Sequence, residues 1–330
     1  MRVALALFLT PVACAASSAP PVPNLSPERR ATTDEVSVPT ALAALAAPTQ
    51  TADSSPRPTS LQRDQSETVL EGNLVQGGVI FGRTPQGSQI ILDDRPIPVD
   101  ENGNFVFGFG RDHGDTAELV LVRPDGTKEP PRTLEIAPQQ WLESSIQVAE
   151  NKANPFTQED LSKIAADRSL KDEARARLGE TVHWTSGFVW PAEGCISSPF
   201  GYRRIVNGTP RRYHSGTDVA APDGMSPLDY VGAEIIAPAD GTVTLASDDM
   251  FFEGGLVFID HGQKLESALM HMSEVLVETG DFVRQGDIIG RVGSTGRVTG
   301  PHLHWSLKWQ ERLLDPELLV EDRPRCTPGL

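Results

Sequence analysis

Basic residues are scarce in this chain, in which 29 lysines and arginines stand against 45 aspartates and glutamates, a formal net charge of −16. Proteins that bind nucleic acid need basic surfaces to neutralise phosphate groups, so this balance argues against a nucleic-acid partner. Histidine is rarer still, with seven residues in 330. Two histidines that lie close together in such a chain therefore need an explanation.

Cysteine is nearly absent, with Cys14, Cys195 and Cys326 as its three positions. None belongs to a CxxC pair, which argues against a zinc–thiolate site. In an oxidising compartment, Cys195 and Cys326 could form a disulfide between the start of the last domain and the C-terminal tail. Two free thiols are the alternative, and the sequence leaves both open.

Apolar segments long enough to cross a membrane are lacking beyond the N-terminus, so no transmembrane helix is expected in the mature chain. Residues 1–15, "MRVALALFLTPVACA", contain a basic residue, a short apolar run and small residues. This pattern is typical of an export signal peptide and predicts a protein of the periplasm or cell envelope. Simple cleavage is favoured, and lipid attachment at Cys14 is the alternative.

Two segments of different composition follow the signal. Residues 16–66 are rich in Pro, Ala, Ser and Thr, and such a segment cannot bury enough apolar surface to fold, which predicts a disordered tether. Residues 67–138 contain short β-rich runs separated by turn sequences such as "DENGN" and "RPDGT". This spacing predicts a small β-sandwich or barrel-like domain that has no residues for chemistry.

Residues 139–183 are expected to form a helical connector. Thr157 with Asp160 and Ser169 with Asp172 are two potential capping boxes, which indicates one or two helices between 157 and 178. The expected apolar positions of this segment are Leu161, Ile164, Leu170 and Leu178.

Residues 184–322 are again rich in β-strand patterns and punctuated by glycine, as in "GGLVFIDHG" and "DFVRQGDIIGRVG". They predict a C-terminal domain built on an antiparallel β-sheet, with 323–330 as a tail. The expected fold class is therefore mainly β, with two β domains joined by the helical connector.

The candidate site centres on "GPHLHWSL", residues 300–307, which sets two histidines one residue apart. Side chains two residues apart on a strand point to the same face, so His302 and His304 should project together. Leu303 and Trp305 should then occupy the opposite face. Such a pair indicates a metal site, a catalytic pair or a coincidence of sequence, and the rest of the chain has to decide among them.

Three further residues in the same domain fit this chemistry. His214 precedes Asp218 by four residues, and His271 lies in an apolar run that predicts a buried strand. A catalytic zinc takes three protein ligands and leaves a fourth position for water. His214, Asp218 and one of the 302/304 pair would complete such a set, but spacing does not say which of the two histidines binds the metal.

Seven motifs between about 188 and 318 make this domain resemble the lysostaphin/LytM-type zinc metallopeptidases, which cut peptidoglycan cross-links. In chain order they are "WPAEGCISSPFGYRR", "YHSGTDVAAP", "IIAPADGTV", "VFIDHG", "LMHMSE", "GDFVRQGDIIGRVGSTGRVTGPHLHW" and "LDPELL".

The resemblance implies a role for each candidate residue. It assigns His214, Asp218 and His304 as the ligands of a Zn²⁺ cofactor, with His271 and His302 as catalytic histidines that do not bind the metal. It also implies an antiparallel β-sheet around a groove.

Three positions depart from the family pattern or have an open role. Leu269 stands where the family usually has tyrosine, which could alter substrate contacts. An insertion over residues 222–233 predicts a longer loop that could narrow the groove. Arg203 could contact substrate or hold a loop.

These features predict a zinc-dependent endopeptidase that hydrolyses peptide cross-links in the peptidoglycan stems, with D-Ala–meso-diaminopimelate bridges favoured by analogy. The alternative is a latent or non-catalytic wall-binding protein that activates a cell-wall amidase. The presence of all five site residues favours the enzyme, and a regulatory partner stays open.

Overall fold

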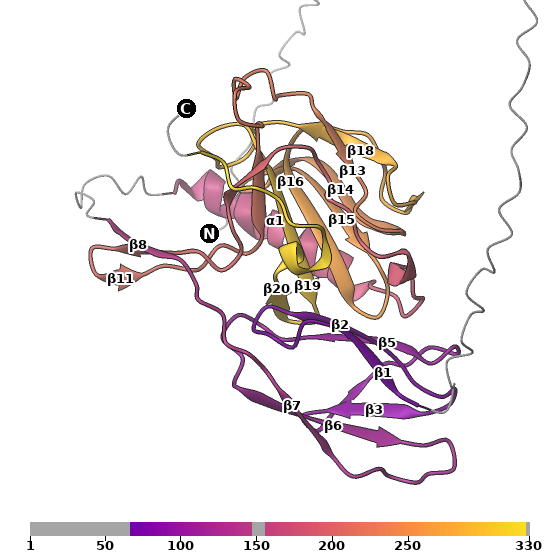
Figure 1. Cartoon of the computed structure of the whole chain (residues 1–330). Coiled ribbons are helices and arrows are strands. Elements are labelled where there is room, and N and C mark those ends of the chain that lie inside the picture. Colours follow the sequence, from indigo (N-terminus) through magenta and orange to yellow (C-terminus); the bar gives the residue numbers. More distant parts are fainter. Residues whose placement is uncertain (1–66, 147–155, 328–330) are drawn as a thin grey trace, which may run out of the picture. The chain divides into compact units, whose positions relative to one another are not determined.

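The computed structural model describes residues 67–146 and 156–327 (Figure 1). The predicted signal peptide, Cys14 and the predicted tether lie outside these residues, as does part of the predicted connector. Within the described ranges, no helix has the length and apolarity needed to cross a membrane. The described chain is mainly β, with antiparallel sheets and a single α-helix, which confirms the predicted fold class.

Seven short strands near the N-terminal end form two antiparallel sheets, ordered β1-β2-β5 and β4-β3-β6-β7. Side chains of both sheets, among them Ile80, Ile90, Phe105 and Leu119, are buried in one apolar cluster. The arrangement is therefore a β-sandwich. Its strands are β1 (Val69–Gly72), β2 (Val79–Arg83), β3 (Gln89–Leu92), β4 (Arg95–Ile97), β5 (Asn104–Gly108), β6 (Thr116–Val122) and β7 (Arg132–Glu135).

The C-terminal part is organised around a ten-stranded sheet whose main order is β17-β14-β15-β16-β19-β12-β9, with β13, β18 and β20 paired at its sides. The strand bounds are β9 (Cys195–Ser198), β12 (Thr217–Ala220), β13 (Glu234–Ile236), β14 (Gly241–Met250), β15 (Gly254–Asp260), β16 (Leu265–Val275), β17 (Phe282–Val283), β18 (Ile288–Val292), β19 (Leu303–Trp309) and β20 (Arg312–Leu314). Two 3₁₀ turns, η2 (Trp184–Ser186) and η3 (Pro316–Leu319), flank them.

A third small sheet contains an element that the sequence did not predict. Strand β8 (Glu143–Ile146) pairs in parallel with β10 (Arg203–Val206), which pairs with β11 (Thr209–Pro210). This sheet joins the segment after the sandwich to the loop that precedes β12.

The apolar cluster of the sandwich continues into the C-terminal part. Trp309 and Leu314 are almost fully buried in the same cluster as Phe107. Leu314 approaches Gly108 so closely that a Cβ atom there would lie 2.6 Å from its side chain. The backbone N–H of Asp315 donates to the carbonyl of Gly77 over 2.8 Å. Burial of this apolar surface stabilises the two β parts together.

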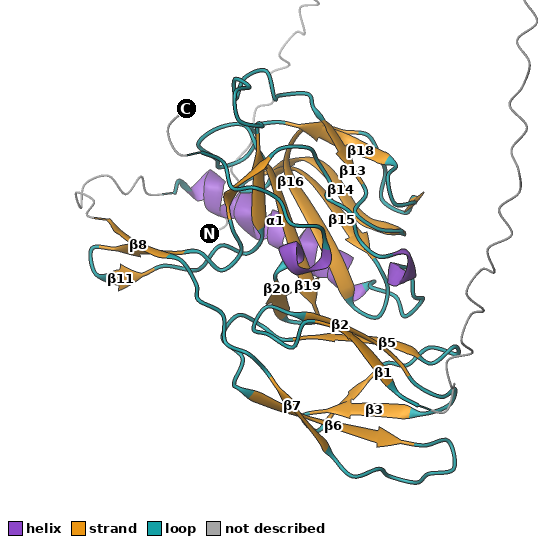
Figure 2. Cartoon of the chain, viewed as in Figure 1, coloured by secondary structure: helices purple, strands orange, loops and turns teal. Residues whose placement is uncertain are grey.

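The connector contains one helix, α1 (Gln158–Ala176), which lies against β14 (Figure 2). The Thr157 hydroxyl accepts from the Asp160 N–H and the Asp160 carboxylate accepts from the Thr157 N–H, which confirms the first capping box. The second predicted capping box, Ser169 with Asp172, is wrong because both residues lie inside α1 and no helix starts there. The Ser169 hydroxyl donates to Glu173.

The apolar face predicted for this helix is wrong in part. Leu161 and Leu170 are 47% and 46% exposed, and the residues that α1 buries are Asp167 and Ala174. Asp167 accepts a hydrogen bond from the backbone N–H of Phe251 over 2.7 Å. Polar contacts to the sheet, rather than an apolar stripe, therefore hold the helix in place.

The sequence left open whether Cys195 and Cys326 form a disulfide or remain as free thiols. Cys195 and Cys326 form a disulfide, with their Cα atoms 4.9 Å apart. The bridge joins β9 to the C-terminal segment, where the Cys326 N–H also donates to the Ile196 carbonyl over 2.9 Å. It closes a loop of 131 residues that contains every candidate site residue.

We expect reduction of this disulfide to destabilise the protein by about 2–4 kcal/mol, because a long closed loop restricts the unfolded chain. Urea denaturation with and without reductant measures the difference. A C195S/C326S variant provides the control, since reductant should leave its midpoint unchanged. Equal midpoints for the wild-type protein in both conditions would show that the bridge contributes nothing to stability.

Candidate metal centre

Three of the predicted site residues converge at the junction of β12 and β19. Asp218 on β12 lies directly opposite His304 on β19 in the antiparallel register, and His214 lies in the loop just before β12. Asp218 Oδ1 is 3.0 Å from His214 Nε2 and 2.8 Å from His304 Nδ1, and the two nitrogens are 3.0 Å apart. These residues are the one group in the described part of the chain that could hold a metal ion.

The alternation of β19 explains how His304 reaches this position. Leu303 and Trp305 are fully buried in the apolar core, so His304 between them must project to the opposite face. His302, one residue before the strand, projects to the same side, with Nε2 3.6 Å from Asp218 Oδ1. The predicted shared face of the two histidines is therefore present.

Second hydrogen bonds orient the two imidazoles of the cluster. Nδ1 of His214 lies 2.9 Å from the Pro199 carbonyl, to which it donates, and this leaves the Nε2 lone pair facing Asp218. Nε2 of His304 lies 3.4 Å from the Ser215 hydroxyl, which leaves Nδ1 facing the cluster. Such outer hydrogen bonds are what hold histidine ligands in metal sites.

The charge state of Asp218 suits a metal ligand. Burial opposes ionisation of its carboxyl, but the close approach of the His214 and His304 imidazoles outweighs burial and holds the pKa of Asp218 far below its usual range. The cluster therefore offers one carboxylate oxygen and two imidazole nitrogens.

This donor set fits zinc. Ligands bonded to a tetrahedral zinc at about 2.0–2.1 Å are separated from one another by about 3.3 Å, close to the 2.8–3.0 Å that separates the three atoms here. Two imidazoles and one carboxylate also leave one tetrahedral position for water or substrate.

His271 reaches the cluster through a β-bulge. On β16, Ala268 and Met270 line the pocket described below, whereas Leu269 is fully buried in the core. Simple alternation would send His271 into the core after Leu269. The register instead shifts opposite Gly255 and Leu256, His271 adopts a φ of +70°, and its side chain joins those of the pocket.

The bulge is held by hydrogen bonds at both ends of His271. Its N–H donates to the Glu253 carbonyl over 2.8 Å, and Nδ1 lies 3.1 Å from the Thr295 carbonyl. Burial lowers the pKa of His271 to about 4, so the imidazole is neutral at pH 7. Its ring centre is 4.9 Å from that of His302 and 6.1 Å from that of His304.

A pocket of about 400 Å³ opens beside this cluster and includes His271 and His304 in its lining. Lys171 and Arg175 of α1 line it as well, a contribution that the sequence did not predict. The insertion at 222–233 supplies no lining residue. Its Tyr230 is buried instead and donates to the Glu193 carbonyl.

Three other positions considered in the sequence, Leu269, Arg203 and His261, lie in surroundings that favour a structural role. Leu269 does not face the pocket because it is buried in the core. Arg203 lies 3.8 Å from Asp112 and 3.9 Å from Glu143, which favours a role in holding the loop. His261 is fully buried and hydrogen-bonds the Asp240 carbonyl and the Ser267 hydroxyl, as a core histidine does.

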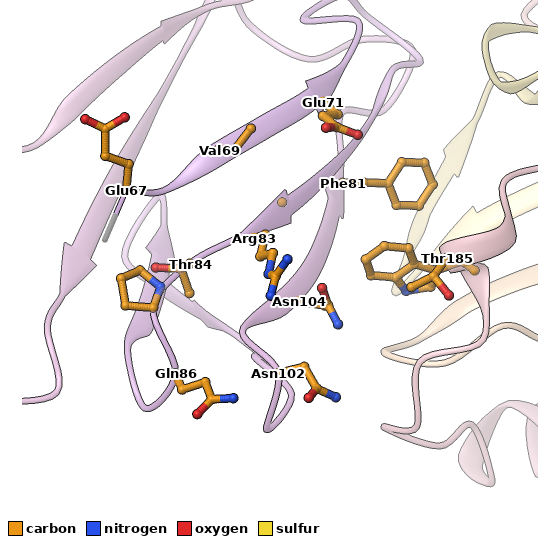
Figure 3. A pocket seen from close by; sticks show the side chains of 13 residues that line it. Glu67, Val69, Glu71, Phe81, Arg83, Thr84, Gln86, Asn102, Asn104 and Thr185 are labelled. Carbon is orange, nitrogen blue, oxygen red and sulfur yellow. The ribbon is translucent and has the colours of Figure 1, made fainter. Parts of the chain in front are cut away.

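A second cavity, of about 250 Å³, lies beside β1 and β2 of the sandwich and the η2 turn. Figure 3 shows Phe81, Arg83, Asn102 and Asn104 around it. None of the five candidate site residues lines it, whereas His271 and His304 line the other pocket.

Comparison with known proteins agrees with this geometry. Residues 212–316 match Peptidase family M23. Peptidoglycan DD-endopeptidase ShyC of Vibrio cholerae is 41% identical over 112 residues, which are 33% of this chain and 26% of that protein. DD-carboxypeptidase/endopeptidase Mpg of Neisseria meningitidis is 37% identical over 132 residues, which are 40% and 28% of the two chains.

The similarity extends to a solved structure. A crystal structure assigned to peptidase M23 from Pseudomonas aeruginosa superposes with a TM-score of 0.54 at 26% identity, over 75% of this chain and 95% of that one. The chain spans only about a quarter of the length of the curated relatives named above. Residues 212–316, which carry the histidine and aspartate cluster, are therefore a peptidase family M23 domain of the LytM type that the motifs predicted.

Proposed function

We propose that this chain is a zinc-dependent endopeptidase that hydrolyses peptide cross-links of bacterial peptidoglycan. The observation that carries the proposal is the convergence of His214, Asp218 and His304, whose ligand atoms lie within 4.8 Å of one another. Three donors with an open fourth position are typical of catalytic zinc, whereas structural zinc has four protein ligands.

The proposed substrate rests on the relatives. ShyC is named a peptidoglycan DD-endopeptidase, and Mpg a DD-carboxypeptidase/endopeptidase. A peptide cross-link between stem peptides is therefore the bond that we assign to this site, with D-Ala–meso-diaminopimelate as the favoured bridge. Export to the periplasm or cell envelope, through the N-terminal signal, would bring the enzyme to that substrate.

The ligands and the two further histidines have separate parts in the proposed reaction. A zinc ion bound by His214, Asp218 and His304 would polarise the scissile carbonyl and lower the pKa of a water in the open position to about 7. The Pro199 carbonyl accepts from Nδ1 of His214 and so keeps that imidazole in the tautomer that offers a lone pair at Nε2, while the Ser215 hydroxyl contacts Nε2 of His304 and orients its ring.

His271 and His302 are the proposed acid–base groups. Nδ1 of His271 is engaged by the Thr295 carbonyl and Nδ1 of His302 by the Gly300 carbonyl, the latter over 2.8 Å. Each ring therefore keeps Nε2 as the proton acceptor. An imidazole in this state takes a proton from the attacking water, can then donate a hydrogen bond to the developing oxyanion, and delivers the proton to the leaving amine.

The alternative, a non-catalytic protein that activates a cell-wall amidase, receives less support. All five positions proposed for binding and catalysis are occupied by the required residue types, and the 222–233 insertion is not among the residues that line the pocket. The named activity of ShyC also favours hydrolysis over wall binding alone.

The first prediction separates metal binding from turnover. We expect the wild-type protein to bind about one zinc per chain, His304→Ala to lose it, and His302→Ala to keep it while kcat falls roughly 10²-fold or more. Elemental analysis of the purified proteins measures the metal. His113→Ala, which removes a histidine from the sandwich, should change neither quantity. Full metal content in His304→Ala would contradict the ligand assignment.

The second prediction concerns the bond that is cleaved. Purified cross-linked sacculi incubated with the wild-type protein should release soluble muropeptides, and mass spectrometry of the products identifies the cross-link. Chelation should stop the release and added zinc should restore it, because the zinc is required for the chemistry. Intact sacculi after incubation with the zinc-loaded protein would overturn the proposed activity.

A further inference from the structure

We propose that Arg212 forms a subsite for a substrate carboxylate in the pocket beside the metal centre. The inference rests on the proposed peptidase function and deepens it. It states that the peptide bound there has a free carboxylate close to the scissile bond rather than the corresponding amide.

The charges that line the pocket are mostly neutralised by one another. It contains four basic and two acidic residues. Lys171 of α1 pairs with Glu253, and Arg175 of α1 pairs with Glu266 at 3.1 Å. These two pairs use both acids of the lining, so the surplus of positive charge comes from the other two cations.

Those two cations differ in their surroundings. Lys308 has a partner outside the pocket, because its Nζ lies 3.4 Å from Glu311 Oε2. Arg212 is exposed and has no ion pair or hydrogen bond through its side chain to any described residue. In a chain with a net charge of −16, an unpaired guanidinium in this pocket is the group with the capacity to bind an anion.

The position of Arg212 places that capacity at the reacting centre. It precedes the proposed ligand His214 by two residues, and it lines the same pocket as His271 and His304. The hydroxyl of Ser215, three residues after Arg212, lies 3.4 Å from Nε2 of His304. A group bound by Arg212 would therefore belong to a residue adjacent to the scissile peptide.

The backbone that carries Arg212 is anchored on both sides. The Arg211 N–H donates to the Arg204 carbonyl over 2.9 Å, and the His214 N–H donates to the Tyr202 carbonyl over 2.8 Å. Tyr213 packs edge-on against Phe200, with ring centres 5.9 Å apart. Binding to Arg212 therefore requires ordering of its side chain alone, which limits the entropy lost.

A guanidinium binds a carboxylate through two parallel hydrogen bonds and discriminates against a neutral amide at the same place. Partial enclosure in the pocket strengthens this attraction relative to open water. The subsite thus predicts selectivity between two substrates that differ only in the carboxylate or carboxamide beside the scissile bond.

The test uses a pair of synthetic cross-linked stem peptides, one with free carboxylates and one amidated. With the zinc-loaded wild-type protein, kcat/KM should be about tenfold higher for the free acid, the effect of one charge-assisted contact. Arg212→Gln should abolish this preference through KM, with kcat for the amidated peptide unchanged. Arg212→Lys should restore part of it, and metal content should stay at the wild-type value.

Arg211→Gln is the matched control, because it removes the same charge one residue away, from a side chain outside the pocket lining. It should keep the wild-type preference. An unchanged preference in Arg212→Gln, or an equal loss on both peptides, would overturn the subsite.

Binding distinguishes failure of the subsite from failure of the peptidase proposal. Calorimetry with the metal-depleted full chain compares the affinities for the two peptides without turnover. If the zinc-loaded protein cleaves neither peptide, the proposed function fails. A preference for the free acid that depends on Arg212 would still support the subsite, and equal affinities would refute it.

Discussion

The candidate metal centre depends on the register between β12 and β19, which sets Asp218 directly opposite His304. A slip of one residue would exchange the faces of β19, turning His304 into the core and its apolar neighbours into the pocket. Leu303 and Trp305, both fully buried, make such a slip costly because each would lose about 1.5–3 kcal/mol of burial. The apolar core thus specifies the geometry of a polar site.

Strand β16 reaches the same site by breaking the alternation that β19 obeys. Its bulge puts Met270 and His271 on the pocket side in succession, and Met272 returns to the core. A non-glycine residue at positive φ costs of order 1–3 kcal/mol, and the hydrogen bond from the His271 N–H to Glu253 offsets part of that cost. Local strain and a proposed catalytic position therefore coincide in His271.

These two strands also show how far the sequence predicts the site. The alternation of "HLHW" follows from the two-residue period of a strand, so the shared face of His302 and His304 could be predicted from the residues alone. Which of the two meets Asp218 could not, because that depends on register across the sheet. The spacing of His271 carries no sign of its bulge, so the residues alone predicted only its burial, and its place beside the other histidines was implied by the family resemblance.

The helix was predicted in extent but not in its mode of attachment. Thr157 and Asp160 cap its start with hydrogen bonds between residues only three positions apart. Such local contacts can be predicted from a short stretch of sequence. Its contacts with the sheet join residues 82 to 91 positions apart. The positions of Leu161 and Leu170 therefore predicted a buried face that the folded protein leaves exposed.

The ion pair between Arg175 of α1 and Glu266 of β16 makes the helix and the sheet depend on each other for stability. Glu266 is 1% exposed, and burial raises the pKa of its carboxyl although Arg175 opposes the shift. Loss of the cation would leave a carboxyl buried without its partner, which is far more costly than loss of an exposed ion pair. The sheet therefore needs α1 in place, and the pocket wall formed by Lys171 and Arg175 is stabilised by the same charges that line it.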